Sequence, residues 1–133
     1  MGYMTKIESN KVEIKKSSEE IYFQISDFNF FKKIIPSNLD NIKILNDSIC
    51  EFKIEGMPKI SLIISEKKPH DFVSMKNHEG KLNFKLNFYI NKIEDYSTLK
   101  IIFEAELNIM MKMMVEKPLK NFLNNLIEKI KSI

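Results

Sequence analysis

The chain has 133 residues, the size of one ordinary domain with its own hydrophobic core, so we expect a single domain over residues 1–133. Its hydrophobic share of 44% and charged share of 29% exclude a disordered chain, and no run approaches the ~20 apolar residues of an integral membrane segment. The net charge is +3, and all 21 basic residues are lysines interleaved with acids, which argues against nucleic-acid binding because such proteins favour arginine.

The chain contains one cysteine, Cys50, so it cannot form an internal disulfide. No residues with metal-ligand spacing flank this cysteine, and no motif indicates a metal or a cofactor. The N-terminus lacks the apolar core of a secretory signal peptide. These observations favour a cytoplasmic location.

The N-terminal quarter predicts a strand followed by two short helices. Residues 5–15 (TKIESNKVEIK) alternate in part between apolar and polar side chains, as in a strand. Ser17, with Glu20 three residues later, forms a capping box that satisfies free backbone amides at a helix start. Asp27 can cap a second short helix over residues 28–35, which a proline closes.

From residue 50 onward the apolar period changes to two, which is typical of strands with one dry face and one wet face. The dry faces contain, in chain order, Cys50, Phe52, Ile54, Ile60, Leu62, Ile64, Leu82, Phe84, Leu86, Phe88, Ile90, Leu99, Ile101, Phe103, Ala105 and Leu107. A shorter strand is expected over residues 72–75, and turn-like segments separate the runs. The pattern predicts an antiparallel meander in which Lys85 and Asn87 lie on the wet face.

The C-terminal segment returns to a helical period after Asn108, which can act as the N-cap. One face of this helix carries Met111, Val115, Leu119, Phe122, Leu126, Ile130 and Ile133. The dry face of the sheet must pack against something, and this long helix is the candidate that the sequence offers. We therefore expect an α+β fold in which the sheet and the helix share one core.

Two segments, SSEEIYFQISDFNFFKKIIP and AELNIMMKMMVEKPLKNFL, together with the element order, resemble the START-like superfamily, also called SRPBCC. This superfamily includes the major birch pollen allergen, lipid-transfer domains and polyketide cyclases, and the chain is similar to its small bacterial members over nearly its whole length. The resemblance implies a helix-grip fold, in which a curved antiparallel sheet of about six to seven strands wraps around a long C-terminal helix, with two short helices after the first strand. It also implies a hydrophobic cavity between sheet and helix.

Aromatic, aliphatic and methionine side chains are the candidates for the wall of such a cavity, because pockets for apolar ligands have mostly apolar walls. The predicted lining residues are Phe31, Phe52, Ile54, Leu62, Phe84, Leu86, Phe88, Phe103, Met111 and Met114. The other interpretation is that these side chains fill the interior and leave no cavity.

Four of the chain's eight methionines lie together before Pro118. On a helix, Met111 faces the sheet and Met114 the flank, while Met110 and Met113 point outward. The flexible thioether adapts to irregular contents, which suits a ligand cavity, and the outward pair suits a partner surface such as a homodimer. Pro118 removes a backbone donor and can kink the helix one turn later.

No constellation in the sequence indicates catalysis, so the chain is more typical of a non-enzyme. His70 and His78 lie in turns flanked by charge and are interpreted as exposed loop residues. Glu104 and Glu106 lie on the wet face of the last strand and are interpreted as solvated. Glu66 continues the dry phase of its strand, so it either reaches a cavity mouth as an acid or base or simply ends the strand.

The sequence and the resemblance together favour a protein that binds or carries a small hydrophobic ligand, such as a lipid, an isoprenoid or an aromatic metabolite. The first alternative is a polyketide cyclase-like enzyme, in which a few polar groups inside the cavity move protons. The second is a non-catalytic protein-interaction module. Polar residues that converge inside would favour the enzyme, and a filled interior beside exposed Met110 and Met113 would favour the interaction module.

Overall fold

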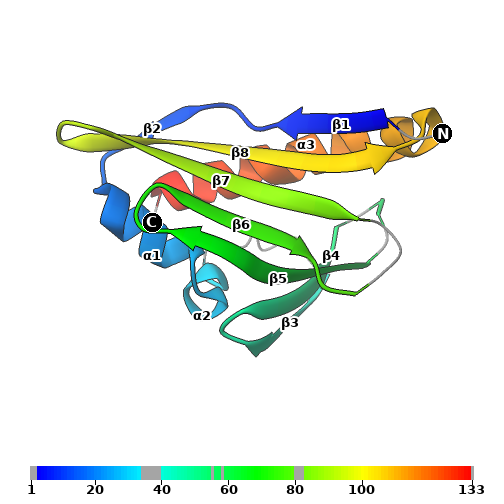
Figure 1. Cartoon of the computed structure of the whole chain (residues 1–133), viewed down its shortest axis with the longest axis horizontal. Helices are drawn as coiled ribbons and strands as arrows, with labels where there is room; N and C mark the ends of the chain where they lie inside the picture. Colours follow the sequence, from blue (N-terminus) through cyan, green and yellow to red (C-terminus); the bar gives the residue numbers. More distant parts are fainter. Residues whose placement is uncertain (1–2, 34–39, 55, 58, 80–82, 133) are drawn as a thin grey trace.

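The computed structural model describes residues 3–33, 40–54, 56–57, 59–79 and 83–132. A curved antiparallel sheet wraps around one long C-terminal helix, as predicted for a helix-grip fold (Figure 1). The elements are, in chain order, β1 (Tyr3–Glu8), β2 (Val12–Ile14), α1 (Ser18–Ile25), α2 (Phe28–Phe31), β3 (Asp40–Asn46), β4 (Ile49–Lys53), β5 (Lys59–Lys68), β6 (Phe72–Asn77), β7 (Phe84–Ile93), β8 (Tyr96–Leu107) and α3 (Ile109–Ser132).

The sheet has eight strands in the order β1-β8-β7-β6-β5-β4-β3, and β2 also pairs with β8. β1 and β2 are the two halves of the first predicted strand. Residues 9–11, which connect β1 to β2, oppose only residues 100–101 of β8. The N-terminal segment therefore contains one extra residue here, which forms a β-bulge. Ser9 stabilises the bulge, because its backbone N–H donates to the Ile101 carbonyl and its Oγ accepts from the Ile101 N–H, each at 2.9 Å.

The edge strand β3 is absent from the sequence prediction. Its pairing with β4 is irregular, with register shifts on either side of the pairs Lys43↔Glu51 and Ile44↔Cys50. Leu45 is exposed beside the half-buried Ile44. A strand that is paired on one side only and bent by register shifts lacks the clean alternation by which the other strands were recognised.

The predicted helix caps are confirmed. The Glu20 N–H donates to Ser17 Oγ at 3.1 Å at the start of α1, and Asp27 Oδ1 accepts from the backbone two residues later at 2.8 Å at the start of α2. At the start of α3, the Met111 N–H donates to Asn108 Oδ1 at 2.8 Å. The proline expected to close the second helix lies outside the described residues.

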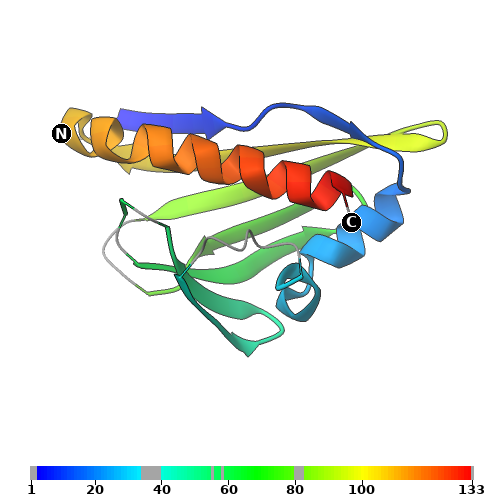
Figure 2. The same cartoon turned by 180° about the vertical axis from the view of Figure 1, so that it is seen from behind.

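α3 packs on the concave side of the sheet against β1, β2 and β8 (Figure 2). Its buried residues are Val115, Leu119, Phe122, Leu123, Leu126, Ile127 and Ile130. The helix continues through Pro118 without a break. α1 and α2 lie toward the C-terminal end of α3, where the Lys16 ammonium donates to the Ile130 carbonyl at 3.1 Å. Among the described helices, none is long and apolar enough to cross a membrane.

The register of β7 follows the predicted alternation with one exception. Leu86 and Phe88 are buried and Lys85 is exposed, as expected. Asn87 was expected on the wet face but is only 5% exposed. Its Oδ1 accepts a hydrogen bond from Ser74 Oγ at 2.6 Å. The expectation of exposure is wrong because Asn87 pairs with Ser74 of β6, which is itself buried on the outer face.

Candidate functional site

Eight of the ten predicted lining residues belong to one continuous core between the sheet and α3 or pack against it. The buried members are Phe52, Ile54, Leu62, Leu86, Phe88 and Phe103. Phe84 and Met111 are partly buried and pack against this core. Met114 is 54% exposed, which does not support a place inside, and its role as a ligand contact stays a prediction. The side chain of Phe31 lies outside the described residues.

The antiparallel register arranges these side chains in rows across the strands. Leu86 of β7 lies opposite Phe103 of β8, and Phe84 lies opposite Ala105. The rings of Phe84 and Phe103 stack with their centroids 5.3 Å apart. Because every second residue of a strand faces the same side, this pairing collects aromatic and aliphatic groups on the concave face.

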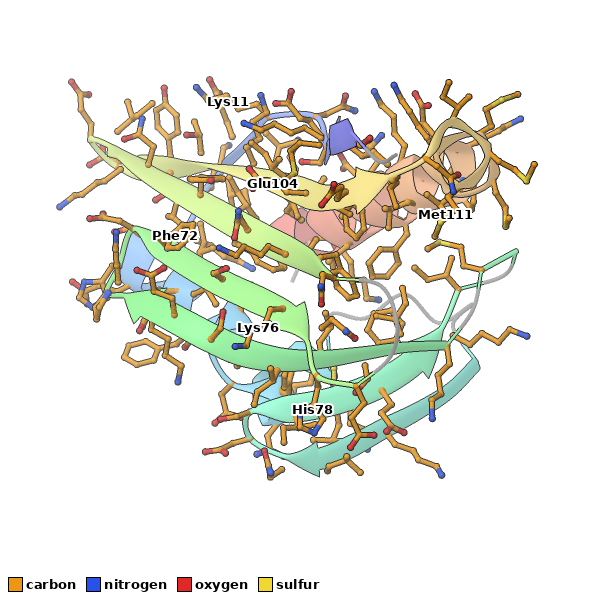
Figure 3. The ribbon with its side chains drawn as sticks, turned by 45° about the vertical axis from the view of Figure 1, so that its right-hand side comes forward. Lys11, Phe72, Lys76, His78, Glu104 and Met111 are labelled. Atoms are coloured by element: carbon orange, nitrogen blue, oxygen red, sulfur yellow. The ribbon has the colours of Figure 1, made fainter. Side chains whose placement is uncertain are left out.

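The two ends of α3 are buried to different degrees. The completely buried residues of its C-terminal half are Leu123, Leu126, Ile127 and Ile130. In its first turn the inward-facing residue is Met111, which is only partly buried. Figure 3 shows Met111 at the N-terminal end of α3, on the side that faces the sheet. Phe84, at the start of β7, is also only partly buried, so the interior is partly accessible to solvent at this end of α3, which we call its less packed end.

The core contains two methionines that the sequence analysis did not assign to the lining. Met57 and Met75 are buried in the same cluster as the aromatic residues. Met75 lies opposite Leu86, and the alternation of the short strand at residues 72–75 could have indicated its direction. Met57 follows Gly56, whose φ of +87° favours glycine, in the connection between β4 and β5, where no periodicity predicts burial.

Cys50 is completely buried, as predicted for a small core residue. Burial raises the pKa of its thiol to about 12, and the negative charge of Glu51 adds to the shift. The thiol is therefore neutral at physiological pH, and a neutral thiol is a poor nucleophile. Among the residues that the structure describes, no group of three or more His, Cys, Asp or Glu is placed to hold a metal.

Glu66 does not reach the interior. A register shift between Ile64 and Glu66 in the pairing of β5 with β6 reverses the alternation, and Glu66 lies opposite Ser74 on the outer face. Its side chain is exposed, and its Oε1 lies 3.6 Å from Lys68 Nζ. The interpretation of Glu66 as a group at a cavity mouth is therefore wrong.

Glu104 and Glu106 lie on the outer face of β8, as predicted. Glu104 Oε1 lies 3.7 Å from Lys6 Nζ on the neighbouring strand β1. Glu106 is exposed. Both carboxylates thus contact solvent and lie on the side of the sheet that faces away from α3.

The two histidines are more buried than exposed loop residues would be. The His70 ring contacts α1, with its centroid 5.4 Å from that of Tyr22 and 6.4 Å from that of Phe23. His78 is half-buried, and its Nε2 lies 3.8 Å from Glu79 Oε1. The expectation of full exposure is wrong because the turn after β5 packs against α1 and the end of β6 stays hydrogen-bonded to β5.

Solved structures share this architecture at low sequence identity. A START superfamily protein from Mycobacterium smegmatis matches with a TM-score of 0.72 and 18% identity, over 98% of this chain and 96% of that one. Norcoclaurine synthase from Thalictrum flavum, in complex with dopamine and hydroxybenzaldehyde, matches with a TM-score of 0.77 and 13% identity, over 98% and 86%. Major latex-like protein 151 from Panax ginseng matches with a TM-score of 0.73 and 15% identity, over 98% and 97%.

The chain therefore has the START-like helix-grip fold, and the resemblance found in the sequence is confirmed at the level of the fold. No protein-family model matches the sequence, and no curated protein sequence matches it. Because one fold hosts many functions, the function has to be inferred from this chain's own residues.

Proposed function

We propose that this chain binds or carries a small hydrophobic molecule, such as a lipid, an isoprenoid or an aromatic metabolite, between the concave face of the sheet and α3. One observation carries the proposal, namely that the apolar interior is fully buried at the C-terminal end of α3 and partly accessible to solvent at the other end. The last turns of α3 are fully buried, whereas Met111 and Phe84 are only partly buried. Such an interior suits the entry of an apolar ligand where α3 begins.

The composition of the interior favours selection by size and shape over polar recognition. Burial of the ligand's apolar surface supplies most of the binding free energy, at about 25 cal/mol per Å² before losses to entropy. The stacked rings of Phe84 and Phe103 lie where a flat or branched apolar group can contact them. Met57, Met75 and Met111 have unbranched thioether side chains that adapt to contents of different shape.

Native mass spectrometry of the freshly purified protein tests the proposal. We expect a species heavier than the polypeptide by one small molecule, which denaturation releases. In ligand-free protein, the neutral apolar probe N-phenyl-1-naphthylamine should bind saturably. The mass of the bare polypeptide, together with no saturable uptake of the probe, would contradict the proposal.

Two adjacent positions on β8 provide matched variants for the same test. Ala105 is buried opposite Phe84, whereas Glu106 is exposed on the other face. Ala105→Leu fills space at the less packed end, so we expect about tenfold weaker probe binding at an overpacking cost of about 1–3 kcal/mol. Glu106→Leu adds the same side chain outside and should leave probe binding unchanged.

A polyketide cyclase-like enzyme is the alternative, and the fold shared with norcoclaurine synthase is the observation that favours it. Proton transfer needs a titratable group close to the reacting atoms. The buried polar side chains among the described residues are Thr5, Ser9, Ser26, Ser61, Ser74, Asn87, Ser97 and Thr98. None of these titrates near neutral pH, so we place ligand binding first and catalysis second.

An interaction module that dimerises through Met110 and Met113 is a further alternative. Both side chains are 75% exposed, which agrees with their predicted outward direction. Sedimentation velocity of the ligand-free protein distinguishes this alternative from a monomeric carrier. A dimer that Met110→Ser dissociates would favour the interaction module.

A further inference from the structure

Large apolar side chains gather in solvent where β1 and the first turns of α3 lie side by side (Figures 1 and 2). We define the methionine patch as Met4, Ile109, Met110, Met113 and Met114, whose exposed fractions lie between 54% and 75%. Met4 and Ile109 border the same surface hollow, so the two elements form one continuous surface. The other strongly exposed large apolar side chains of the described part are Phe23, Leu45 and Tyr89, which lie singly on three other elements.

The size of the methionine patch favours insertion into a lipid surface over a stable dimer. The largest apolar patch on a typical monomer covers about 300–600 Å², and patches of this kind often have a function. Five large side chains that are mostly exposed reach the upper part of that range, on the order of 600 Å². A stable interface between two proteins buries about 800 Å² on each partner and extends beyond such a patch.

Lysines within and beside the methionine patch agree with an anionic lipid surface. Lys112 is exposed within the patch, and Lys117 is exposed one turn after Met113. At a bilayer these ammonium groups reach the headgroup phosphates. Glu106 and Glu116 are also exposed near the patch. We therefore expect the apolar side chains to supply most of the affinity and the lysines a smaller part.

We propose that the methionine patch docks this protein peripherally on the surface of an anionic lipid bilayer. Met110 and Met113 enter the boundary between headgroups and acyl chains, as the apolar face of an interfacial helix does. Met111 lies between them in the sequence but packs against the core. Docking therefore brings the less packed end of the interior to the bilayer. The ligand class that this geometry serves is a bilayer-soluble lipid, a conclusion that rests on the proposed function.

Flotation with large unilamellar vesicles tests the docking. The vesicles contain phosphatidylcholine alone or a mixture of phosphatidylcholine and phosphatidylglycerol. We expect the wild type to float with both and more strongly with the mixture. The double variant Met110→Ser, Met113→Ser should lower the partition coefficient about tenfold or more, because two apolar side chains no longer enter the bilayer. Leu45→Ser removes an exposed apolar side chain from β3 and, as the matched control, should leave flotation unchanged.

The lysine contribution and the depth of insertion provide two further readouts. Lys112→Gln should weaken binding to the mixed vesicles about fivefold and leave binding to phosphatidylcholine unchanged. Met110→Cys can be labelled selectively with an environment-sensitive fluorophore, because the native Cys50 is completely buried. We expect its emission to shift to the blue on vesicle addition, and no shift for a label at Leu45→Cys.

Equal flotation of the wild type and the double variant would overturn the docking. A wild type that sediments as a dimer, and that the double variant dissociates, would also overturn it, because the patch would then be an interface between copies. Binding of N-phenyl-1-naphthylamine without vesicles separates this inference from the proposed function. Probe binding without flotation overturns the docking alone, and flotation without probe binding overturns the carrier proposal alone.

Discussion

Phe52 on β4 and Phe122 on α3 stack with their ring centroids 5.4 Å apart and their planes inclined by 29°. β4 lies near the β3 edge of the sheet, whereas α3 packs on β1, β2 and β8 at the opposite edge. The pair therefore spans the concave side of the sheet and connects β4 to α3. Both side chains are buried, so the contact combines the burial of two rings with the added attraction of a stacked pair.

Phe122→Ala should destabilise the protein by about 3–5 kcal/mol, because it removes a buried ring and leaves a cavity on the helix side of this contact. Urea denaturation followed by circular dichroism measures the change. Leu45→Ala, at an exposed position on β3, is the control and should shift the free energy of unfolding by less than about 0.5 kcal/mol. Equal effects of the two changes would mean that α3 and β4 are not packed together in solution.

Met111→Ala should cost about 1–2 kcal/mol of unfolding free energy, less than a fully buried methionine, because Met111 is only partly buried. It should also shift binding toward bulkier apolar probes, since it enlarges the less packed end of the interior. A panel of naphthylamine probes of increasing size measures the preference. Met110→Ala should change neither quantity because its side chain is in solvent. An unchanged preference in Met111→Ala would place the ligand elsewhere.

Asn87→Ala should destabilise the protein by about 1–2 kcal/mol, because the buried Ser74 hydroxyl loses the oxygen to which it donates at 2.6 Å. Thermal and urea denaturation report the loss. Asn91→Ala, on the same face of β7 but exposed, is the matched control and should stay within about 0.5 kcal/mol of the wild type. If both variants were neutral, the outer-face hydrogen bond would contribute nothing to stability.

The titration of Cys50 predicts a loss of stability at alkaline pH. Burial raises the pKa of the folded thiol from its ordinary value of 9.0 to about 12. The buried thiol contributes fully to folding stability below about pH 9, where it is protonated in both the folded and the unfolded state. This contribution falls as pH rises from about 9 toward 12, because in that range only the unfolded state ionises. In that window the wild type should lose about 1.4 kcal/mol per pH unit relative to Cys50→Ala, as measured by urea denaturation. Parallel pH profiles would contradict the raised pKa.

Strict alternation predicted β7 and β8 because a strand with one buried face must place every second side chain inside. The two bulges follow no such local rule. The one at Ser9 divides the first strand, and the one before Glu66 reverses which side chains face the core. The first is fixed by pairing with β8, which is distant in the sequence, whereas the second lies between β5 and β6, two strands joined by a short turn. The irregular pairing of β3 with β4 across a short turn likewise leaves no clean alternation in the sequence.

The interior was predicted better than the surface. The apolar phase identified Phe52, Phe88 and most other core residues, because burial on a sheet follows the period directly. Met111 falls on the inner face of an ideal helix and Met114 on its flank, and of the two only Met111 packs against the core. His70 packs on Tyr22 of α1, which is far away in the sequence, and the periodicity of neither segment indicates this contact.

Methionine methyl resonances test the central claim most directly, because these side chains report separately on the interior, its less packed end and the surface. Met57 and Met75 lie inside, Met111 lies at the less packed end, and Met110 and Met113 lie in solvent. The protein, isotopically labelled on its methionine methyl groups, is titrated with N-phenyl-1-naphthylamine in the absence of vesicles. We predict saturable shifts at the first three positions and none at the last two. Shifts confined to Met110 and Met113, or no saturable shift at any methionine, would contradict a ligand site between the sheet and α3.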